Sequence, residues 1–95
     1  MQIIWLPRAR ADVTHARQYI EQHNPGAAQR LVLALYAAVR RIAAAPHLGR
    51  PGRVARTREL VVPRTPYIVA YTVIGDQLTI IAVIHGAREW PERFE

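Results

Sequence analysis

The 95-residue sequence contains neither cysteine nor lysine. Without cysteine the chain can form no disulfide and no thiolate metal site, a composition typical of proteins in the reducing cytosol. No apolar run reaches the roughly 18–20 residues that span a bilayer. Residues 1–7 carry no basic stretch before their apolar residues and no cleavage site, so we expect no signal peptide and a cytoplasmic protein.

All 13 cationic residues are arginine, and with seven carboxylates they give a net charge of +6. A GC-rich genome also favours arginine over lysine, but it does not explain the sign of the charge. A small basic domain typically meets a polyanion, either nucleic acid or an acidic protein. Arginine suits both partners because its planar fork pairs with phosphate or carboxylate through two hydrogen bonds.

The length predicts a single domain over residues 1–95, with a core small enough to gain from a partner chain. Ile3–Leu6 predicts a first strand, and residues 7–23 an amphipathic helix. Asn24 and Pro25 predict the cap and first turn of a second helix that ends near Ala45. Its apolar stripe is Ala28, Leu31, Leu35, Ala38 and Ile42. So short a connection predicts an antiparallel helical hairpin.

The second half has the two-residue period of strands. A basic loop over residues 49–56 precedes expected strands at 59–62, 67–74 and 78–85, with a hairpin turn at Gly75 and Asp76. The last strand is almost continuously apolar, which predicts a central position in the sheet. We therefore predict an α+β fold of order β-α-α-β-β-β, with the helical hairpin packed on a small, mostly antiparallel sheet.

Two segments are candidates for a functional site. The first is the basic segment of residues 50–64, an expected anion-binding face or, alternatively, a solvated loop. Its arginines are Arg50, Arg53, Arg56, Arg58 and Arg64, against one carboxylate, Glu59.

The second candidate follows the last strand. His85 ends the strand, where it can act as an acid or base, and Arg88 can hold a phosphate. The alternatives are a structural histidine and, for Trp90, a residue that closes the core. The other histidines have no ligand spacing, and no metal set or phosphate loop is present, so we predict no metal and no cofactor.

In order and spacing, several stretches resemble the RelE/ParE superfamily of bacterial toxins. They are NPGAA (24–28), PHLGRPG (46–52), TRELVV (57–62), PYIVAY (66–71) and VIHGAR (83–88). The resemblance covers essentially the whole chain. It implies a growth-inhibiting toxin of a type II toxin–antitoxin system, in some cases serving plasmid stabilisation. It also implies a cognate antitoxin partner that is acidic and partly disordered.

The superfamily contains two chemistries, and both stay open here. RelE-like members cut mRNA on the ribosome by attack of the RNA's own 2′-hydroxyl, without a metal. By resemblance Arg88 and His85 would be catalytic, and Arg53, Arg58 and Arg64 would clamp phosphates. Three features depart from that pattern: Ile68 stands in place of a middle-strand arginine, the loop lysines are absent, and Phe94 replaces a tyrosine.

ParE-like members inhibit DNA gyrase and need no catalytic set. His85 after Val83 and Ile84, and Arg58 before its strand, are similar to that branch, although the tail over residues 86–91 is not. The sequence favours the ParE-like interpretation. Outside the superfamily, a basic nucleic-acid-binding module and a structural protein are the alternatives, and the charge disfavours the second.

Overall fold

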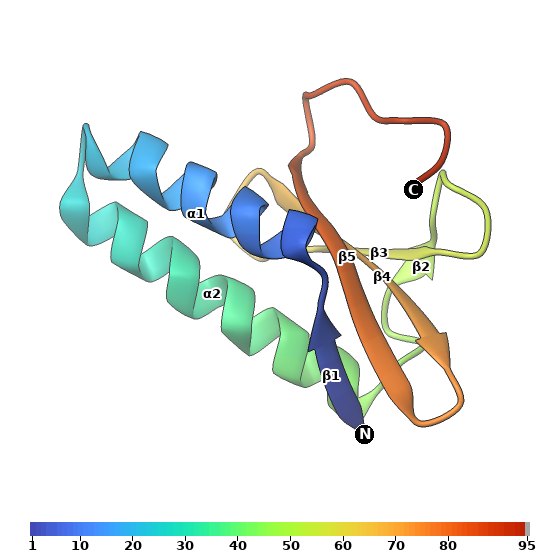
Figure 1. The fold of residues 1–95 in the computed structure, drawn as a ribbon. Helices are drawn as coiled ribbons and strands as arrows, with labels where there is room; N and C mark the ends of the chain where they lie inside the picture. Colours follow the sequence, from blue (N-terminus) through green and yellow to red (C-terminus); the bar gives the residue numbers. More distant parts are fainter. Residues whose placement is uncertain (95) are drawn as a thin grey trace.

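The fold was described from a computed structural model, which covers residues 1–94. Two helices lie against a five-stranded sheet of order β1-β5-β4-β3-β2 (Figure 1). The elements are β1 (Gln2–Trp5), α1 (Pro7–Glu21), α2 (Pro25–Ala44), β2 (Arg50–Pro51), β3 (Arg58–Val61), β4 (Tyr67–Ile74) and β5 (Gln77–His85). β1 pairs with β5 in parallel, and every other pairing is antiparallel. The predicted fold class is confirmed.

One expectation for the basic segment was wrong. Arg50 and Pro51 form a short edge strand rather than a loop, and they pair with Glu59 and Arg58 of β3. Proline tolerates this edge position because its missing N–H leaves no central ladder bond unmade. The opposite charges of Arg50 and Glu59, which lie directly across from one another, favour the same pairing.

Local signals place the helical hairpin as predicted. The Asn24 side chain accepts a hydrogen bond from the Ala27 N–H at 3.1 Å, and Pro25 opens α2. The apolar stripe of α2 is buried against the sheet, as expected: Ala28, Leu31, Leu35, Ala38 and Ile42. No helix within residues 1–94 is long and apolar enough to cross a membrane.

A β-bulge in β5 determines which face its side chains reach. Ala70 pairs with Ala82 and Tyr71 with Ile80, which leaves Ile81 as an extra residue. Before the bulge, Leu78 and Ile80 face the helices; beyond it, Val83 does, while Ala82 and Ile84 face the opposite side. His85, two residues after Val83, therefore lies on the helix side, where its ring meets Tyr67 edge-on at 5.4 Å.

The C-terminal segment covers the sheet face opposite the helices, which we call the outer face. Trp90 and Phe94 pack there against a cluster formed by Ala70, Ile81, Ala82 and Ile84. The guanidinium of Arg53 stacks over Trp90 at 3.8 Å, and that of Arg8 over Phe94 at 5.2 Å. The tail thus returns from the end of β5 toward the basic segment (Figure 1). Trp90 thus packs on the smaller outer-face cluster rather than on the main core between helices and sheet.

A buried carboxylate fastens the basic segment to the sheet. Glu59 is 2% exposed and accepts hydrogen bonds from the Arg53 N–H at 2.7 Å, the Arg53 guanidinium at 3.2 and 3.3 Å, and Arg50 at 3.0 Å. Burial alone would raise the pKa of Glu59. The hydrogen bonds and the positive charge of Arg53 outweigh burial, so the pKa lies below its usual value of 4.5.

This lowered pKa predicts how stability depends on pH. The ionised Glu59 carboxylate stabilises the fold above about pH 4.5, and this stabilisation is lost as the pH falls through the lower folded-state pKa. Glu59→Gln should reduce the free energy of unfolding at pH 7 by about 2 kcal/mol. Urea unfolding from pH 7 down to pH 3 should show the difference from the native protein shrinking at the acid end.

The matched control is Glu21→Gln. Glu21 pairs with Arg17 at 3.2 Å on an exposed helix face, where such a pair contributes only about 0.5 kcal/mol. An E59Q protein as stable as the native one at pH 7 would contradict the anchoring role of Glu59.

Candidate functional site

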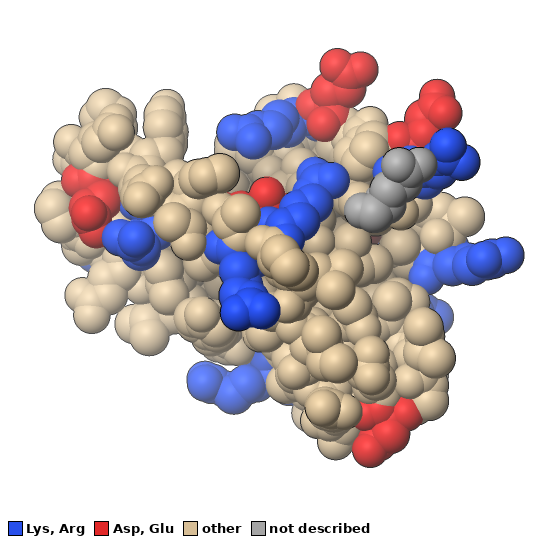
Figure 2. Space-filling view, in the orientation of Figure 1, with Lys and Arg blue, Asp and Glu red and all other residues tan. Residues whose placement is uncertain are grey.

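Several arginine side chains are visible on one face of the molecule (Figure 2). They gather over the junction of the start of α1 and the end of β5, and most acidic side chains lie at the periphery of this view (Figure 2). The predicted anion-binding arginines nevertheless do not form one continuous patch. Some of them pair with the buried Glu59, and the others lie at three separate hollows.

Three arginines of the basic segment are engaged within the protein. Arg50 and Arg53 pair with Glu59, and Arg53 also stacks on Trp90. Arg58 donates a hydrogen bond of 2.7 Å to the carbonyl of Gly49. Their charges remain partly exposed, but their geometry is set by internal partners. The contacts of these three side chains hold the basic segment in place, so they are not free to turn toward a ligand.

Arg56 and Arg64 occupy the left-handed backbone region, at φ of 65° and 62°. This region is uncommon for residues other than glycine and marks tight turns. Arg56 and Arg58 border a hollow of about 390 Å³ beside Thr72 of β4, whose hydroxyl donates to the Arg56 carbonyl at 3.1 Å. Arg64 lies in the connection between β3 and β4, on a different hollow.

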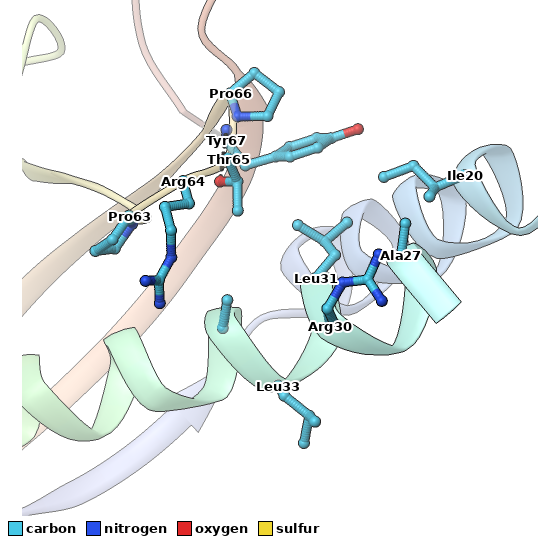
Figure 3. Close-up of a pocket in the computed structure, with 11 residues that line it drawn as sticks. Ile20, Ala27, Arg30, Leu31, Leu33, Pro63, Arg64, Thr65, Pro66 and Tyr67 are labelled. Atoms are coloured by element: carbon cyan, nitrogen blue, oxygen red, sulfur yellow. Dashed lines mark hydrogen bonds between the residues drawn. The ribbon is translucent and has the colours of Figure 1, made fainter. Parts of the chain in front are cut away.

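That hollow, which we call the apolar groove, runs between α2 and the β3–β4 connection and measures about 680 Å³ (Figure 3). It is lined by Ile20, Ala27, Arg30, Leu31, Leu33, Ala34, Pro63, Arg64, Thr65, Pro66 and Tyr67. In Figure 3, Arg64 extends toward α2 while Leu31 points toward Tyr67. Among residues 1–94, Arg30 and Arg64 are the charged residues that line it, and Leu33 is 62% exposed. The groove is therefore apolar with a cationic rim.

A third hollow, the donor-lined cavity, measures about 600 Å³ between α1 and the end of β5. It brings the two predicted residues His85 and Arg88 together. Its lining is Asp12, His15, Ala16, Tyr19, Tyr67, Val83, His85, Ala87 and Arg88. A turn closed by the Arg88 N–H and the His85 carbonyl at 3.0 Å places Arg88 at its border.

Besides Asp12, three polar residues that line the cavity were not predicted as site residues: His15, Tyr19 and Tyr67. His15 and Tyr19 are spaced four residues apart on α1 and so share a helix face. That spacing was the available signal, but nothing in it tells which strand the face meets. Within residues 1–94 no three His, Asp or Glu side chains are grouped so that they could hold a metal ion.

The known proteins to which the chain is similar include bacterial toxins and a protein of a toxin–antitoxin system. The chain is 42% identical over 87 residues to Toxin RelE2 of Caulobacter vibrioides, spanning 92% of this chain and 97% of that protein. It is 40% identical over 91 residues to Y4kP of Sinorhizobium fredii, described as a candidate toxin, spanning 96% and 94%. Its fold is similar to a chain of the chromosomal ParDE TA system from P. aeruginosa, with a TM-score of 0.81, 24% identity and coverage of 90% and 95%.

The family profile described as ParE toxin of type II toxin-antitoxin system, parDE, matches residues 3–90. This match spans both helices and all five strands. It agrees with the resemblance to the RelE/ParE superfamily that the motifs indicate. The chain therefore belongs to the ParE family of type II toxin–antitoxin toxins.

Proposed function

We propose that this toxin inhibits growth by acting on DNA gyrase in the cytoplasm, and that it does so by docking rather than by catalysis. The observation that supports this proposal is that the middle-strand position at which the nucleases carry an arginine lies on the sheet face opposite His85. Groups that stabilise and protonate the same phosphate must converge on one side. Ile68 stands where the nucleases have a middle-strand arginine. It pairs with Ile84, which belongs to the outer-face cluster that includes Ala70. His85 lies on the helix side instead.

The outer face also offers little to an RNA backbone. Trp90 and Phe94 cover it, and Phe94 has no hydroxyl to contribute. Arg53, which could clamp a phosphate, is held between Glu59 and Trp90. On the helix side, Arg58 lies across from Tyr71 and is held by the Gly49 carbonyl. A surface arranged in this way favours contact with a protein target over cleavage of a nucleic acid.

The second candidate function is ribosome-dependent mRNA cleavage. It is favoured by the name of the relative RelE2 and by the approach of His85 and Arg88 in one cavity. The guanidinium of an arginine stays protonated at neutral pH and so cannot accept a proton. His85 would therefore be the sole proton-transfer group of that pair. The two candidates differ in the macromolecule that is damaged, which makes them separable in cells.

The deciding experiment is brief expression without the antitoxin, followed by mapping of DNA breaks and of cuts in translated mRNA. Gyrase inhibition predicts gyrase-dependent DNA breaks with intact mRNA, and purified toxin should block supercoiling by gyrase. A gyrase variant selected for resistance serves as the control and should restore growth. Cuts in translated mRNA with intact DNA would replace this proposal with the nuclease.

We further expect His85 and Arg88 to contribute to toxicity through their position at the end of β5. His85→Ala and Arg88→Ala should each allow growth, while circular dichroism shows an unchanged fold. Arg40→Ala is the matched control, because Arg40 is exposed on α2 and lines none of the three hollows. Full toxicity of both variants would remove these residues from the site.

The proposed antitoxin is an acidic segment that folds into the apolar groove. Apolar side chains would cover Leu31, Leu33 and Pro63, and carboxylates would meet Arg30 and Arg64 at the rim. Charge complementarity supports this occupant, because within the described residues 1–94 the groove lining includes two arginines and no carboxylate. A segment that folds on binding would also add apolar burial to a small core.

Reversal of both rim charges tests this docking mode. Arg30→Glu with Arg64→Glu should weaken antitoxin binding roughly tenfold and flatten its dependence on salt, since exposed charge pairs are screened. Isothermal titration at two salt concentrations measures both effects. Arg40→Glu with Arg41→Glu carries the same charge change elsewhere on α2, and an equal loss in that control would contradict docking in the groove.

A further inference from the structure

β1 is an edge strand without the features that usually protect such a strand from pairing. At the opposite edge of the sheet, β2 consists of Arg50 and Pro51 alone, and charge, proline and short length all disfavour pairing with another strand. Where β5 extends beyond β1, the Asp12 carboxylate accepts a hydrogen bond from the Val83 N–H at 2.9 Å and closes that edge. The residues of β1, in contrast, are Gln, Ile, Ile and Trp, without charge or proline.

The backbone groups on the open side of β1 belong to Ile3 and Trp5. The first N–H of the strand, from Gln2, donates to the Asp76 carbonyl at 2.9 Å. Alternate residues of a parallel ladder turn toward the neighbouring strand, so Gln2 and Ile4 face β5. Ile3 and Trp5 therefore direct their N–H and C=O groups to the side on which β1 has no neighbour in the described sheet. The side chain of Ile3 is also 37% exposed.

We propose that this edge joins two copies of the chain, whose β1 strands pair antiparallel about a two-fold axis. Pro7 has no N–H and opens α1, so pairing is limited to residues 2–6, and their midpoint is Ile4. In the register centred there, Ile3 of each copy and Trp5 of the other exchange both backbone hydrogen bonds. Their side chains also become neighbours on the helix side, and an aromatic residue opposite a β-branched one stabilises a sheet.

The charges at the two ends of β1 fit this arrangement. Asp76 lies beside the start of the strand, with its side chain 91% exposed and 3.8 Å from the amino terminus. Arg8 and Arg10 follow the end of the strand, in the first turn of α1. In Figure 2 the surface over β1 is uncharged, with arginine side chains above it and an acidic side chain below it. Antiparallel pairing brings the acidic end of each copy toward the basic end of the other, so two chains of net charge +6 can meet here.

A second copy suits this edge better than an acidic antitoxin segment does. The carboxylates of such a segment would find no arginine among the four residues of β1, whereas the apolar groove offers Arg30 and Arg64. A copy of β1 matches the edge in length and in its uncharged, apolar character. The pairing does not depend on whether the toxin acts on gyrase or on mRNA.

Disulfide cross-linking tests both the dimer and its register, because the chain has no cysteine of its own to compete. In the proposed register the two Ile4 positions form a non-hydrogen-bonded pair, with Cα atoms about 4.5 Å apart. A disulfide spans roughly 4.4–6.8 Å between Cα atoms, so Ile4→Cys should cross-link to itself on oxidation. The two Ile3 positions lie diagonally, about 7–8 Å apart, so Ile3→Cys is the matched control and should form little cross-linked dimer.

Sedimentation equilibrium of the purified toxin measures the association itself. The native chain should dimerise reversibly between micromolar and millimolar concentration. Ile3→Lys should raise the dissociation constant of the dimer about tenfold or more, because it removes the contact with Trp5 of the other copy and adds a charge to the edge. Val61→Lys is the matched control and should dimerise like the native chain, because Val61 is 47% exposed on β3, with β4 and β5 between it and β1.

Three results would overturn the proposal: a native chain that stays monomeric at millimolar concentration, equal cross-linking of the I3C and I4C proteins, or an equal loss of dimer in the V61K control. An antitoxin strand on this edge would leave the toxin monomeric and make I3K weaken antitoxin binding, which would also overturn it. None of these measurements involves gyrase or ribosomes, so their outcome is separate from that of the proposed function.

Discussion

Much of this molecule depends on one extra residue in strand β5. Side chains alternate between the faces of a regular strand, so an inserted residue exchanges the faces of everything that follows. Ile81 is that residue, and beyond it Ala82 and Ile84 serve the outer face while Val83 and His85 serve the helix side. The bulge therefore builds the platform for the C-terminal tail and the wall of the donor-lined cavity at once. Without the bulge, each side chain after it would lie on the opposite face of the sheet, and both surfaces would be lost.

Charge is used in two different ways along the chain. In the basic segment, arginine is largely structural. The buried Glu59 forms ion pairs with Arg50 and Arg53, and the guanidinium of Arg53 also stacks on Trp90. Elsewhere the arginines stand at the borders of hollows, as Arg64 and Arg88 do. The net charge therefore does not indicate where a partner binds unless the arginines that are paired within the protein are left out. Once those are left out, Arg64 and Arg88 remain at the borders of the two hollows that the helices line.

The fold could be predicted well wherever the information was local. The cap at Asn24, the stripe of α2 and the turn at Gly75, with its positive φ of 58°, each follow from residues close in sequence. The bulge, the two-residue strand β2 and the packing of the tail depend on pairing with other segments of the chain, and no local pattern encodes them. The site was predicted in part for the same reason. His85 and Arg88 are neighbours in sequence, whereas His15 reaches them only through the packing of α1 on β5.

The two tryptophans of the chain lie on opposite sides of the sheet. Trp5 packs with the helix-side core and meets the Tyr36 ring at 5.4 Å, while Trp90 lies on the outer face beneath Arg53, with its indole N–H buried. Each side of the molecule therefore carries its own optical probe. Emission from an indole is sensitive to a nearby cation and to entry of water, so lifting of the tail changes the signal of Trp90 and leaves that of Trp5. Because water shifts the emission of either indole to longer wavelength, a variant that keeps one of the two tryptophans reports on one face of the sheet.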